Sequence, residues 1–427
     1  MHSLTLEPIA HIGGEVTLPG SKSLTNRALL LGALASGNTR LSNVLRSDDT
    51  DRMVDALRQL GVSVSFDDSG LACEVRGEGG LFQAPNEVEF FLGNAGTAIR
   101  PLTAVLAMMP GNFVVDGDEY MRERPIGHLT DALASLGARI RFRGKPGYPP
   151  FEIAGGSIKG GEVSLPGNIS SQFLTSLLIA LPLASRDSEV TVIGEQVSKP
   201  YLDITLDIMQ RFGVTASHEN YQRFRIPGQQ QYQSPGSMLI EGDASSASYF
   251  FGAAAISGDT IRVNGVGSGS VQGDVAFLDV IEEMGATVQR YEDHVDVTGG
   301  ELRGVDLDLN HIPDAAMTLA TMALFADGPT RIRNIYNWRV KETDRMTAIA
   351  TELRKLGATV ETGDDYIVIE PPEQIMPAAI DTYGDHRIAM AFSLAAFGDQ
   401  PITINDPDCT RKTFPDYFDV LASITRG

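Results

Sequence analysis

The chain has few cysteines and no long apolar run. Its 427 residues include two cysteines, Cys73 and Cys409, which argues against a disulfide framework and is typical of a reducing cytoplasm. The longest apolar stretch, 28–35, is interrupted by Gly32 and is far too short to span a bilayer. Residues 1–20 have no basic segment followed by an apolar one, so no targeting segment is expected. These absences predict a cytoplasmic protein.

Basic residues are also scarce. The chain has 34 lysines and arginines against 55 acids, and its formal net charge is −21. Nucleic acid is therefore a poor partner, because a phosphate backbone requires a basic face. If the ligand is an anion, the few cations must be gathered locally against the field of the whole molecule. The hydrophobic content of 42% is ordinary for a globular protein, and the length allows two or three domains.

Several common cofactor motifs are missing. The stretch 19–23, PGSKS, resembles a phosphate loop, but no glycine precedes its lysine as a Walker A motif requires. The stretch 265–270, GVGSGS, departs from a dinucleotide fingerprint, and no zinc or EF-hand spacing is present. The lone histidines His128 and His311 are interpreted as structural. The sequence therefore predicts no metal and no cofactor.

The chain does contain an internal repeat. A helix that ends in a large apolar residue and glycine, followed by a β-branched run, occurs five times, with the glycines at Gly61, Gly137, Gly213, Gly285 and Gly357. The glycines are 76, 76, 72 and 72 residues apart. Each stands where a helix C-terminus favours a left-handed residue. The regular spacing indicates successive copies of one structural unit.

A second motif recurs along the chain with the same period as the first. Six Ala- and Leu-rich segments, each opening on small or polar residues, are apolar on most faces and are expected to form buried helices. The intervening helices are amphipathic and should lie nearer solvent. The fold class is therefore α/β, with six βαβαββ-type repeats. The sixth is cut short, and the N-terminus supplies two strand-like runs that are expected to complete it.

This arrangement predicts two domains of three repeats each. One is discontinuous, 1–20 plus about 240–427, and the other is inserted, about 21–239. The chain would cross between them near Gly20 and near Ile240, and two crossings favour hinge closure over a cleft.

Cations stand near the starts of several predicted helices, where free N–H groups and the helix dipole attract anions. A cation gains nothing from the dipole there, so its presence indicates an anionic ligand. A solvated surface charge is the alternative for each one, and a scaffold solenoid is the alternative for the repeat. The stretch SSQF at 170–173 opens another helix, where its hydroxyls suit either a phosphate or simple helix capping. The cations concerned are Lys22, Arg27, Arg100, Arg124, Lys341, Arg345, Arg387, and Arg411 or Lys412.

Nine stretches together resemble one family, the 5-enolpyruvylshikimate-3-phosphate synthases, in register along the whole chain. The resemblance implies two inside-out α/β domains. It also implies transfer of the enolpyruvyl group of phosphoenolpyruvate to the 5-hydroxyl of shikimate-3-phosphate by addition and elimination, with release of phosphate, on the route to aromatic amino acids. The stretches are LPGSKSLTNRALLLGALASG, FLGNAGTAIRPL, RERPIGHL, SSQFLTSLL, EGDASSASYF, NHIPDAAM, YNWRVKETDR, YGDHRIAMAF and KTFPDYF.

The resemblance also implies roles for individual residues. Asp314 resembles the base, Glu342 the acid, and Lys22 a residue that touches both substrates, although Asp314 after Pro313 also suits a helix N-cap. The implied shikimate-3-phosphate residues are Lys22, Ser23, Arg27, Ser170, Ser171, Gln172, Ser198, Tyr201, Asp314, Asn337 and Lys341. The implied phosphoenolpyruvate residues are Lys22, Asn94, Gly96, Arg100, Arg124, Gln172, Arg345, His386, Arg387 and Lys412. Gly96, Thr97 and Pro101 stand as in family members that glyphosate inhibits, which implies sensitivity.

Three alternatives stay open at this point. A sister enolpyruvyl transferase that acts on UDP-N-acetylglucosamine shares the chemistry, but its loop cysteine is missing from the stretch DEYMRERPIG at 118–127. A small-molecule kinase would need an ATP site with a metal-binding acid and a true phosphate loop, which are not found. A non-catalytic anion-binding or scaffold protein is the third alternative. A monomer is expected, because no long apolar interface stripe is evident.

Overall fold

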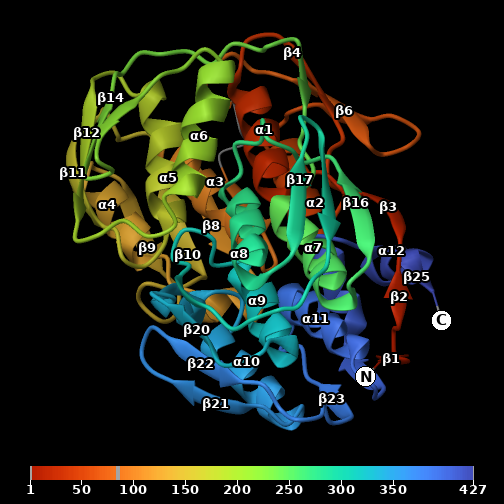
Figure 1. Cartoon of the computed structure of the whole chain (residues 1–427). Coiled ribbons are helices and arrows are strands. Elements are labelled where there is room, and N and C mark those ends of the chain that lie inside the picture. The colour runs from red at the N-terminus through yellow and green to blue at the C-terminus, as the bar shows by residue number, and fades with distance from the viewer. Residues whose placement is uncertain (1, 83–86, 427) are drawn as a thin grey trace. The chain divides into compact units, whose positions relative to one another are not determined.

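A computed structural model describes residues 2–82 and 87–426 (Figure 1). The chain divides into two compact units, Met1–Pro19 with Glu241–Gly427, and Gly20–Ile240. The first is called the discontinuous unit and the second the inserted unit. None of the helices in the described part of the chain is long and apolar enough to cross a membrane.

The inserted unit contains three four-stranded sheets of the same topology. In each, the first two strands are parallel, and an antiparallel hairpin follows a second helix. One helix joins the two parallel strands in the second and third sheets, whereas the first strand of the first sheet, β15, comes from the end of the unit. The sheets, in strand order, are β15 (Ser237–Leu239), β4 (Asn38–Ser42), β6 (Ala72–Arg76), β5 (Val64–Phe66); β7 (Glu87–Phe91), β8 (Asn112–Asp116), β10 (Phe151–Ala154), β9 (Arg139–Phe142); and β11 (Gly161–Pro166), β12 (Ser188–Ile193), β14 (Arg223–Ile226), β13 (Ser217–Glu219). The helices are α1 (Lys22–Leu34), α2 (Asp48–Gln59), α3 (Gly96–Met108), α4 (Gly127–Ser135), α5 (Ser171–Ala180) and α6 (Pro200–Arg211), with short 3₁₀ turns η1 (Met121–Glu123) and η2 (Leu181–Leu183).

The discontinuous unit repeats this plan. Its sheets are β3 (Gly14–Thr17), β16 (Thr260–Asn264), β18 (His294–Thr298), β17 (Thr287–Arg290); β19 (Asp306–Asp308), β20 (Thr330–Arg333), β22 (Ile367–Glu370), β21 (Thr359–Thr362); β23 (Ala378–Ile380), β24 (Ile402–Asn405), β1 (Ser3–Leu6); and the pair β2 (His11–Ile12), β25 (Thr425–Arg426). Its helices are α7 (Ala244–Ser257), α8 (Phe277–Met284), α9 (Ala316–Met322), α10 (Arg345–Lys355), α11 (His386–Ser393) and α12 (Tyr417–Ile424), with 3₁₀ turns η3 (Gly273–Ala276), η4 (Ala323–Phe325), η5 (Tyr336–Val340), η6 (Leu394–Phe397) and η7 (Pro407–Lys412).

The N-terminal strands serve two different sheets. β1 pairs with β24 of the sixth repeat, and Figure 1 shows the red N-terminal strands beside the blue C-terminal elements. β3 instead pairs in parallel with β16 and forms the first strand of the fourth repeat. The chain then leaves to form the inserted unit and returns at α7. In the same way β15 ends the inserted unit but pairs with β4 of the first repeat.

Burial follows the two helix types that the sequence predicts. In α1 every residue except Ser23 is buried, and α7 is buried over 244–255. The amphipathic helix α2 buries six of its twelve residues, on one face. The five repeat glycines have φ between 77° and 123°, the left-handed conformation expected at helix C-termini.

Candidate active site

A cluster of charged side chains surrounds Arg345 in the discontinuous unit. Arg345 is the first residue of α10 and is 0% exposed. Its Nη1 donates to Asp314 Oδ1 (2.8 Å), its Nη2 to Glu342 Oε2 (2.8 Å) and its Nε to Asp385 Oδ2 (2.7 Å). Three carboxylates from three separate segments therefore meet at one planar guanidinium, which holds them in fixed directions. Arg345 is enclosed by these carboxylates rather than presented to solvent.

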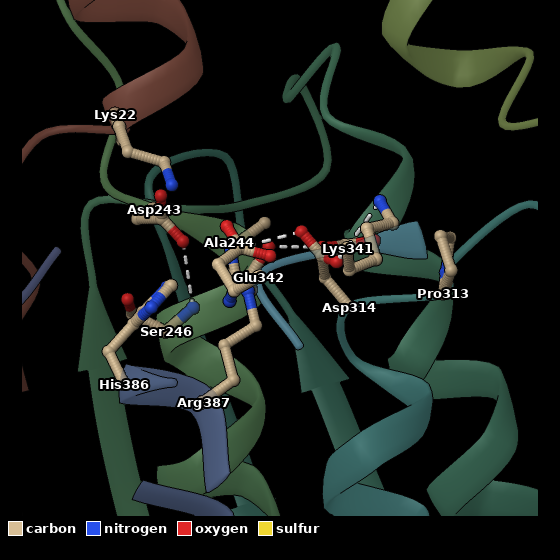
Figure 2. Close-up of polar contacts among 12 residues, drawn as sticks. Lys22, Asp243, Ala244, Ser246, Pro313, Asp314, Lys341, Glu342, His386 and Arg387 are labelled. Carbon is tan, nitrogen blue, oxygen red and sulfur yellow. Dashed lines mark hydrogen bonds and ion pairs between the residues drawn. The ribbon is translucent and has the colours of Figure 1, made fainter. Parts of the chain in front are cut away.

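Two further cations face Asp314. Lys341 Nζ lies 3.5 Å from Asp314 Oδ1, and Arg387 Nη2 lies 3.1 Å from Asp314 Oδ2. In Figure 2, Asp314, Lys341, Glu342 and Arg387 lie together. Burial by itself raises the pKa of Asp314, but Arg387, Lys341 and Arg345 outweigh it and hold that pKa well below its ordinary value. Burial lowers the pKa of the Lys341 ammonium, with Asp314 opposing the shift.

The backbone before α9 fixes the direction of Asp314. Trp338 is fully buried in η5 and donates its indole N–H to the carbonyl oxygen of Pro313 (2.7 Å). The N-cap residue of α9 is Ala315, and the Asp314 carboxylate instead contacts the three cations. The simple helix-cap interpretation of Asp314 is therefore not what the structure shows. Asn337, which precedes Trp338, is also buried.

The N-terminus of α11 supplies the other side of the cluster. Asp385 caps this helix by accepting the backbone N–H of Arg387 (3.0 Å), and His386 is buried beside it with Nδ1 3.6 Å from Asp385 Oδ1. Arg387 Nη1 donates to the Tyr249 hydroxyl on α7 (3.3 Å). Asp243 in turn accepts the backbone N–H of Ser246 at the start of α7, as Figure 2 shows.

The structure distinguishes between the two cations of η7. Lys412 is buried, whereas Arg411 is exposed and lies 3.4 Å from Asp408. Lys412 is therefore the inward-facing cation that the sequence left undecided.

In the inserted unit, two arginines flank the start of α3. Arg100 Nη1 donates to Gln172 Oε1, and Arg124 Nη1 donates to Asn94 Oδ1 (2.6 Å). A Cβ atom placed on Gly96 would lie 2.7 Å from Arg100 Nη1 and 2.8 Å from Arg124 Nη2. Glycine is therefore required if both guanidinium groups are to keep these positions.

Lys22 and Arg27 both lie on α1 and are both buried. Lys22 Nζ lies 3.3 Å from Asp49 Oδ2 in the first turn of α2, so its charge is balanced inside the unit. Arg27 donates through Nε to Thr205 Oγ1 (2.9 Å) and through Nη1 to the carbonyl oxygen of Ser23 (3.0 Å). Burial lowers the pKa of Arg27 to about 10, partly offset by Tyr201.

The predicted phosphate-binding hydroxyls lie at helix starts in the inserted unit. Ser170 caps α5 by accepting the backbone N–H of Gln172 (3.2 Å), and Ser171 is the first residue of that helix. Ser198, before α6, has a φ of 52° and is buried. A serine in this left-handed conformation is uncommon, and such strain concentrates at functional positions.

The sequence interpretation missed several partners of the predicted residues. Asp385 holds Arg345, Asp49 balances Lys22, and Tyr249 contacts Arg387. A fourth group, Asp274, is fully buried and accepts a hydrogen bond from Ser245. Asp385 could have been found from its place directly before His386 and Arg387. The others carry no signal, because acids in first helical turns are ordinary and a tyrosine in an apolar helix resembles core.

The chain is similar to known proteins over nearly its whole length. The family model of EPSP synthase (3-phosphoshikimate 1-carboxyvinyltransferase) matches residues 6–421. The chain belongs to the EPSP synthase family. It is 58% identical over 425 residues to the 3-phosphoshikimate 1-carboxyvinyltransferase of Sulfurovum sp. (strain NBC37-1), and 57% identical over 426 residues to that of Photobacterium profundum. Both matches cover the full length of both chains.

Solved structures give the same result. The EPSP synthase of Acinetobacter baumannii superposes with a TM-score of 0.83 at 26% identity, over 99% of this chain and 98% of the other. The enolpyruvyl transferase NikO from Streptomyces tendae shares the fold, with a TM-score of 0.79 at 18% identity. The family, the α/β repeat fold and the transferase class predicted from the motifs are confirmed, and the kinase and scaffold alternatives are set aside.

Proposed function

We propose that this member of the EPSP synthase family transfers the enolpyruvyl group of phosphoenolpyruvate to the 5-hydroxyl of shikimate-3-phosphate and releases phosphate. The observation that carries the proposal is the pair of carboxylates, Asp314 and Glu342, held by one buried guanidinium among further cations. Addition followed by elimination needs one base and one acid within reach of two polyanions. The cluster offers both kinds of group in one place.

The proposed roles divide the proton transfers between the two carboxylates. Asp314 takes the proton of the 5-hydroxyl as its oxygen bonds to C2 of phosphoenolpyruvate, and Glu342 delivers a proton to the methylene carbon. In the second step the Glu342 carboxylate takes back a methyl proton, the double bond re-forms, and phosphate departs with the proton that Asp314 holds. Protons and electron pairs balance over the two steps, and no redox change occurs.

The low pKa of Asp314 bears on its role as a base. With Arg387, Lys341 and Arg345 facing it, the carboxylate is a weak base in the ligand-free protein. Substrate phosphate and carboxylate groups that bind Lys341 and Arg387 would compete with Asp314 for those charges. The pKa of Asp314 would then rise, so that the base gains strength when the anions are in place.

The remaining assignments are proposed on the same basis. For shikimate-3-phosphate they include Ser23, Arg27, Ser170, Ser171, Gln172, Ser198, Tyr201 and Asn337, and for phosphoenolpyruvate Asn94, Gly96, Arg100, Arg124, His386 and Lys412, with Lys22 serving both. Arg345 acts in this proposal mainly by orienting the two carboxylates, because its three donor nitrogens already bond to Asp314, Glu342 and Asp385.

Phosphate release tests the proposal directly. Purified protein given phosphoenolpyruvate and shikimate-3-phosphate, without ATP or added metal, should release phosphate only when both substrates are present. Release with UDP-N-acetylglucosamine in place of the shikimate compound would show that the protein is instead an enolpyruvyl transferase acting on that sugar nucleotide. No release with either acceptor would overturn it. We also expect a monomer, which sedimentation analysis of the same preparation checks.

Sensitivity to glyphosate is part of the proposal and depends on Gly96. The Gly96→Ala variant places a methyl group against Arg100 and Arg124, which must move apart. We expect the wild-type protein to be inhibited competitively with phosphoenolpyruvate. The variant should show a raised KM for phosphoenolpyruvate and weaker inhibition, by about tenfold each. Equal inhibition of both proteins would contradict this placement of the inhibitor.

A further inference from the structure

Glu352 is a charged residue at a position that is apolar in the other repeats. Counting five residues back from each repeat glycine gives Ala56, Ala132, Ile208, Val280 and, in the fifth copy, Glu352. All five side chains are buried, and Glu352 is 0% exposed. Burying a carboxylate is costly unless it is fully paired. Since four repeats fold with an apolar residue here, the charge in the fifth is not needed to build the helix or its core.

The Glu352 carboxylate bonds to the segment that leads into α11. Its Oε2 accepts the backbone N–H of Asp381 (3.1 Å), and its Oε1 accepts the Tyr383 hydroxyl (2.7 Å). Lys355, one turn further along α10, supplies the counter-charge at 2.8 Å and also lies 2.8 Å from Asp381 Oδ2. These contacts join the middle of α10 to the residues just before Asp385.

The segment that Glu352 holds is strained. Tyr383 has a φ of 55° and is followed by Gly384 with a φ of 65°. A bulky residue in this left-handed conformation persists only when its surroundings fix it. The hydrogen bond from the Tyr383 hydroxyl to Glu352 is such a restraint, because it fixes the side chain of the strained residue.

The first residue of α10 contacts the end of the same segment, because Arg345 donates to the Asp385 carboxylate through two nitrogens. α10 therefore contacts the segment 381–385 through Arg345 and Glu352, which are seven residues apart on the helix. We propose that Glu352 is a positioning residue that holds this segment so that Asp385 meets Arg345 and Arg387 meets Asp314. Its effect on substrate rests on the function proposed above, in which Arg387 and His386 bind phosphoenolpyruvate.

Two substitutions separate positioning from a structural role. Glu352→Val restores the kind of residue found at Val280 and removes a buried charge. Lys355 keeps Asp381 as its partner, so no unpaired charge is left and the fold should keep its stability. Tyr383→Phe removes one hydroxyl and leaves the charge pair in place. The matched controls are Tyr366→Phe and Glu361→Val, which break a similar Tyr–Glu hydrogen bond (2.7 Å) on the exposed hairpin of the same unit.

Hydrogen–deuterium exchange, steady-state kinetics and the thermal midpoint are measured on each full-length variant. Hydrogen–deuterium exchange over 381–389 should become about tenfold faster in Glu352→Val and in Tyr383→Phe, and not in the controls. Steady-state kinetics should show KM for phosphoenolpyruvate raised about tenfold with kcat changed less than about twofold. KM for shikimate-3-phosphate and the thermal midpoint should stay near the wild-type values.

The outcomes are distinct. Exchange and KM that both match the controls would overturn the proposal. Faster exchange with an unchanged KM would also overturn it, by showing that the contact is only structural. If wild-type protein releases no phosphate, the proposed function fails, while the exchange measurement still decides whether Glu352 orders the segment.

Discussion

At the scale of single residues, the buried aspartates Asp314 and Asp274 lie in different electrostatic environments. Arg387, Lys341 and Arg345 all act on the Asp314 carboxylate, while the Asp274 carboxylate is buried with Ser245 as a neutral donor. The pKa values of two aspartates of one unit are therefore shifted in opposite directions. This difference is the usual way in which a protein assigns acid and base roles.

Replacing Asp314, the proposed base, tests the role of its environment. Asp314→Asn keeps the shape of the side chain but cannot accept a proton, so kcat should fall by about 10²–10⁴-fold. The three cations lose a counter-charge, and ligand affinity measured by calorimetry should stay near that of the wild-type protein or increase. Glu342→Gln should behave in the same way. Normal turnover by either variant would show that its proton-transfer role is wrong.

Asp274 offers a prediction about stability and pH. Burial raises its pKa from 3.8 to about 7, the nearby Asp314 carboxylate adds to the shift, and Ser245 and Arg387 oppose it. Because the folded-state pKa is the higher one, the stability contributed is present below about pH 4 and is lost as pH rises through about 7. Asp274→Asn should therefore match the wild-type protein near pH 4 and exceed it at pH 8, by no more than roughly 4 kcal/mol.

Urea unfolding across this pH range measures the difference. Ser245 can still donate to the amide oxygen of the variant, so the local hydrogen bond is preserved. A stability difference that is the same at pH 4 and pH 8 would contradict the assigned protonation of Asp274.

The motifs in the sequence named residues that lie together in the structure, but not the partners of those residues. Asp314, Glu342, Lys341, Arg345 and Arg387 were all chosen from motifs, and the structure brings them together. Their partners Asp385 and Tyr249 were not predicted, because the pairing depends on how α7, α10 and α11 pack. No spacing within one segment records that packing.

At the scale of elements, the repeat made the helices predictable and left two long-range strand pairings hidden, β3 with β16 and β15 with β4. The positive φ of all five repeat glycines was expected from the helix ends alone. The parallel pairing of β3 with β16 joins residues more than two hundred positions apart, and only the completed sheet reveals it. The N-terminus was expected to complete the sixth repeat, and it also supplies the first strand of the fourth.

The repeat glycines allow a matched comparison. At Gly61 the φ is 88° and a Cβ atom would meet nothing within 4 Å, so Gly61→Ala should cost only the left-handed strain, about 1–2 kcal/mol. At Gly285 the φ is 123° and a Cβ atom would lie 2.5 Å from the carbonyl oxygen of Glu301. Gly285→Ala must also displace backbone and should cost clearly more.

Equilibrium unfolding in urea checks both variants. Equal losses of stability would show that the close approach of Glu301 to Gly285 relaxes without cost. A negligible loss for Gly61→Ala would show that the left-handed helix end carries no strain at that position.

At the scale of the whole molecule, the net charge determines how anions are attracted, and the chain connections determine where the two units could be separated. A net charge of −21 repels anions at long range, so the buried cations must act over short distances. The chain crosses between the units twice, and within each unit the two chain ends at these crossings lie close together. Pro19 accepts a hydrogen bond from Asp243 (3.0 Å) within the discontinuous unit. Within the inserted unit, Ile240 donates to Ser42 (2.9 Å) at the end of β4, and Gly20 lies against Asn43, the next residue.

Separate expression of the two units tests whether each is an independent folding unit. All three sheets of the inserted unit lie within 20–240, so this fragment should unfold cooperatively by itself. A second chain that joins 1–19 to 241–427 through a short Gly-Ser link should also fold, because residues 19 and 243 are already hydrogen-bonded. Neither fragment alone should release phosphate, since each lacks residues proposed to bind the substrates. A gradual, non-cooperative unfolding curve for the inserted fragment would show that its three repeats depend on the rest of the chain.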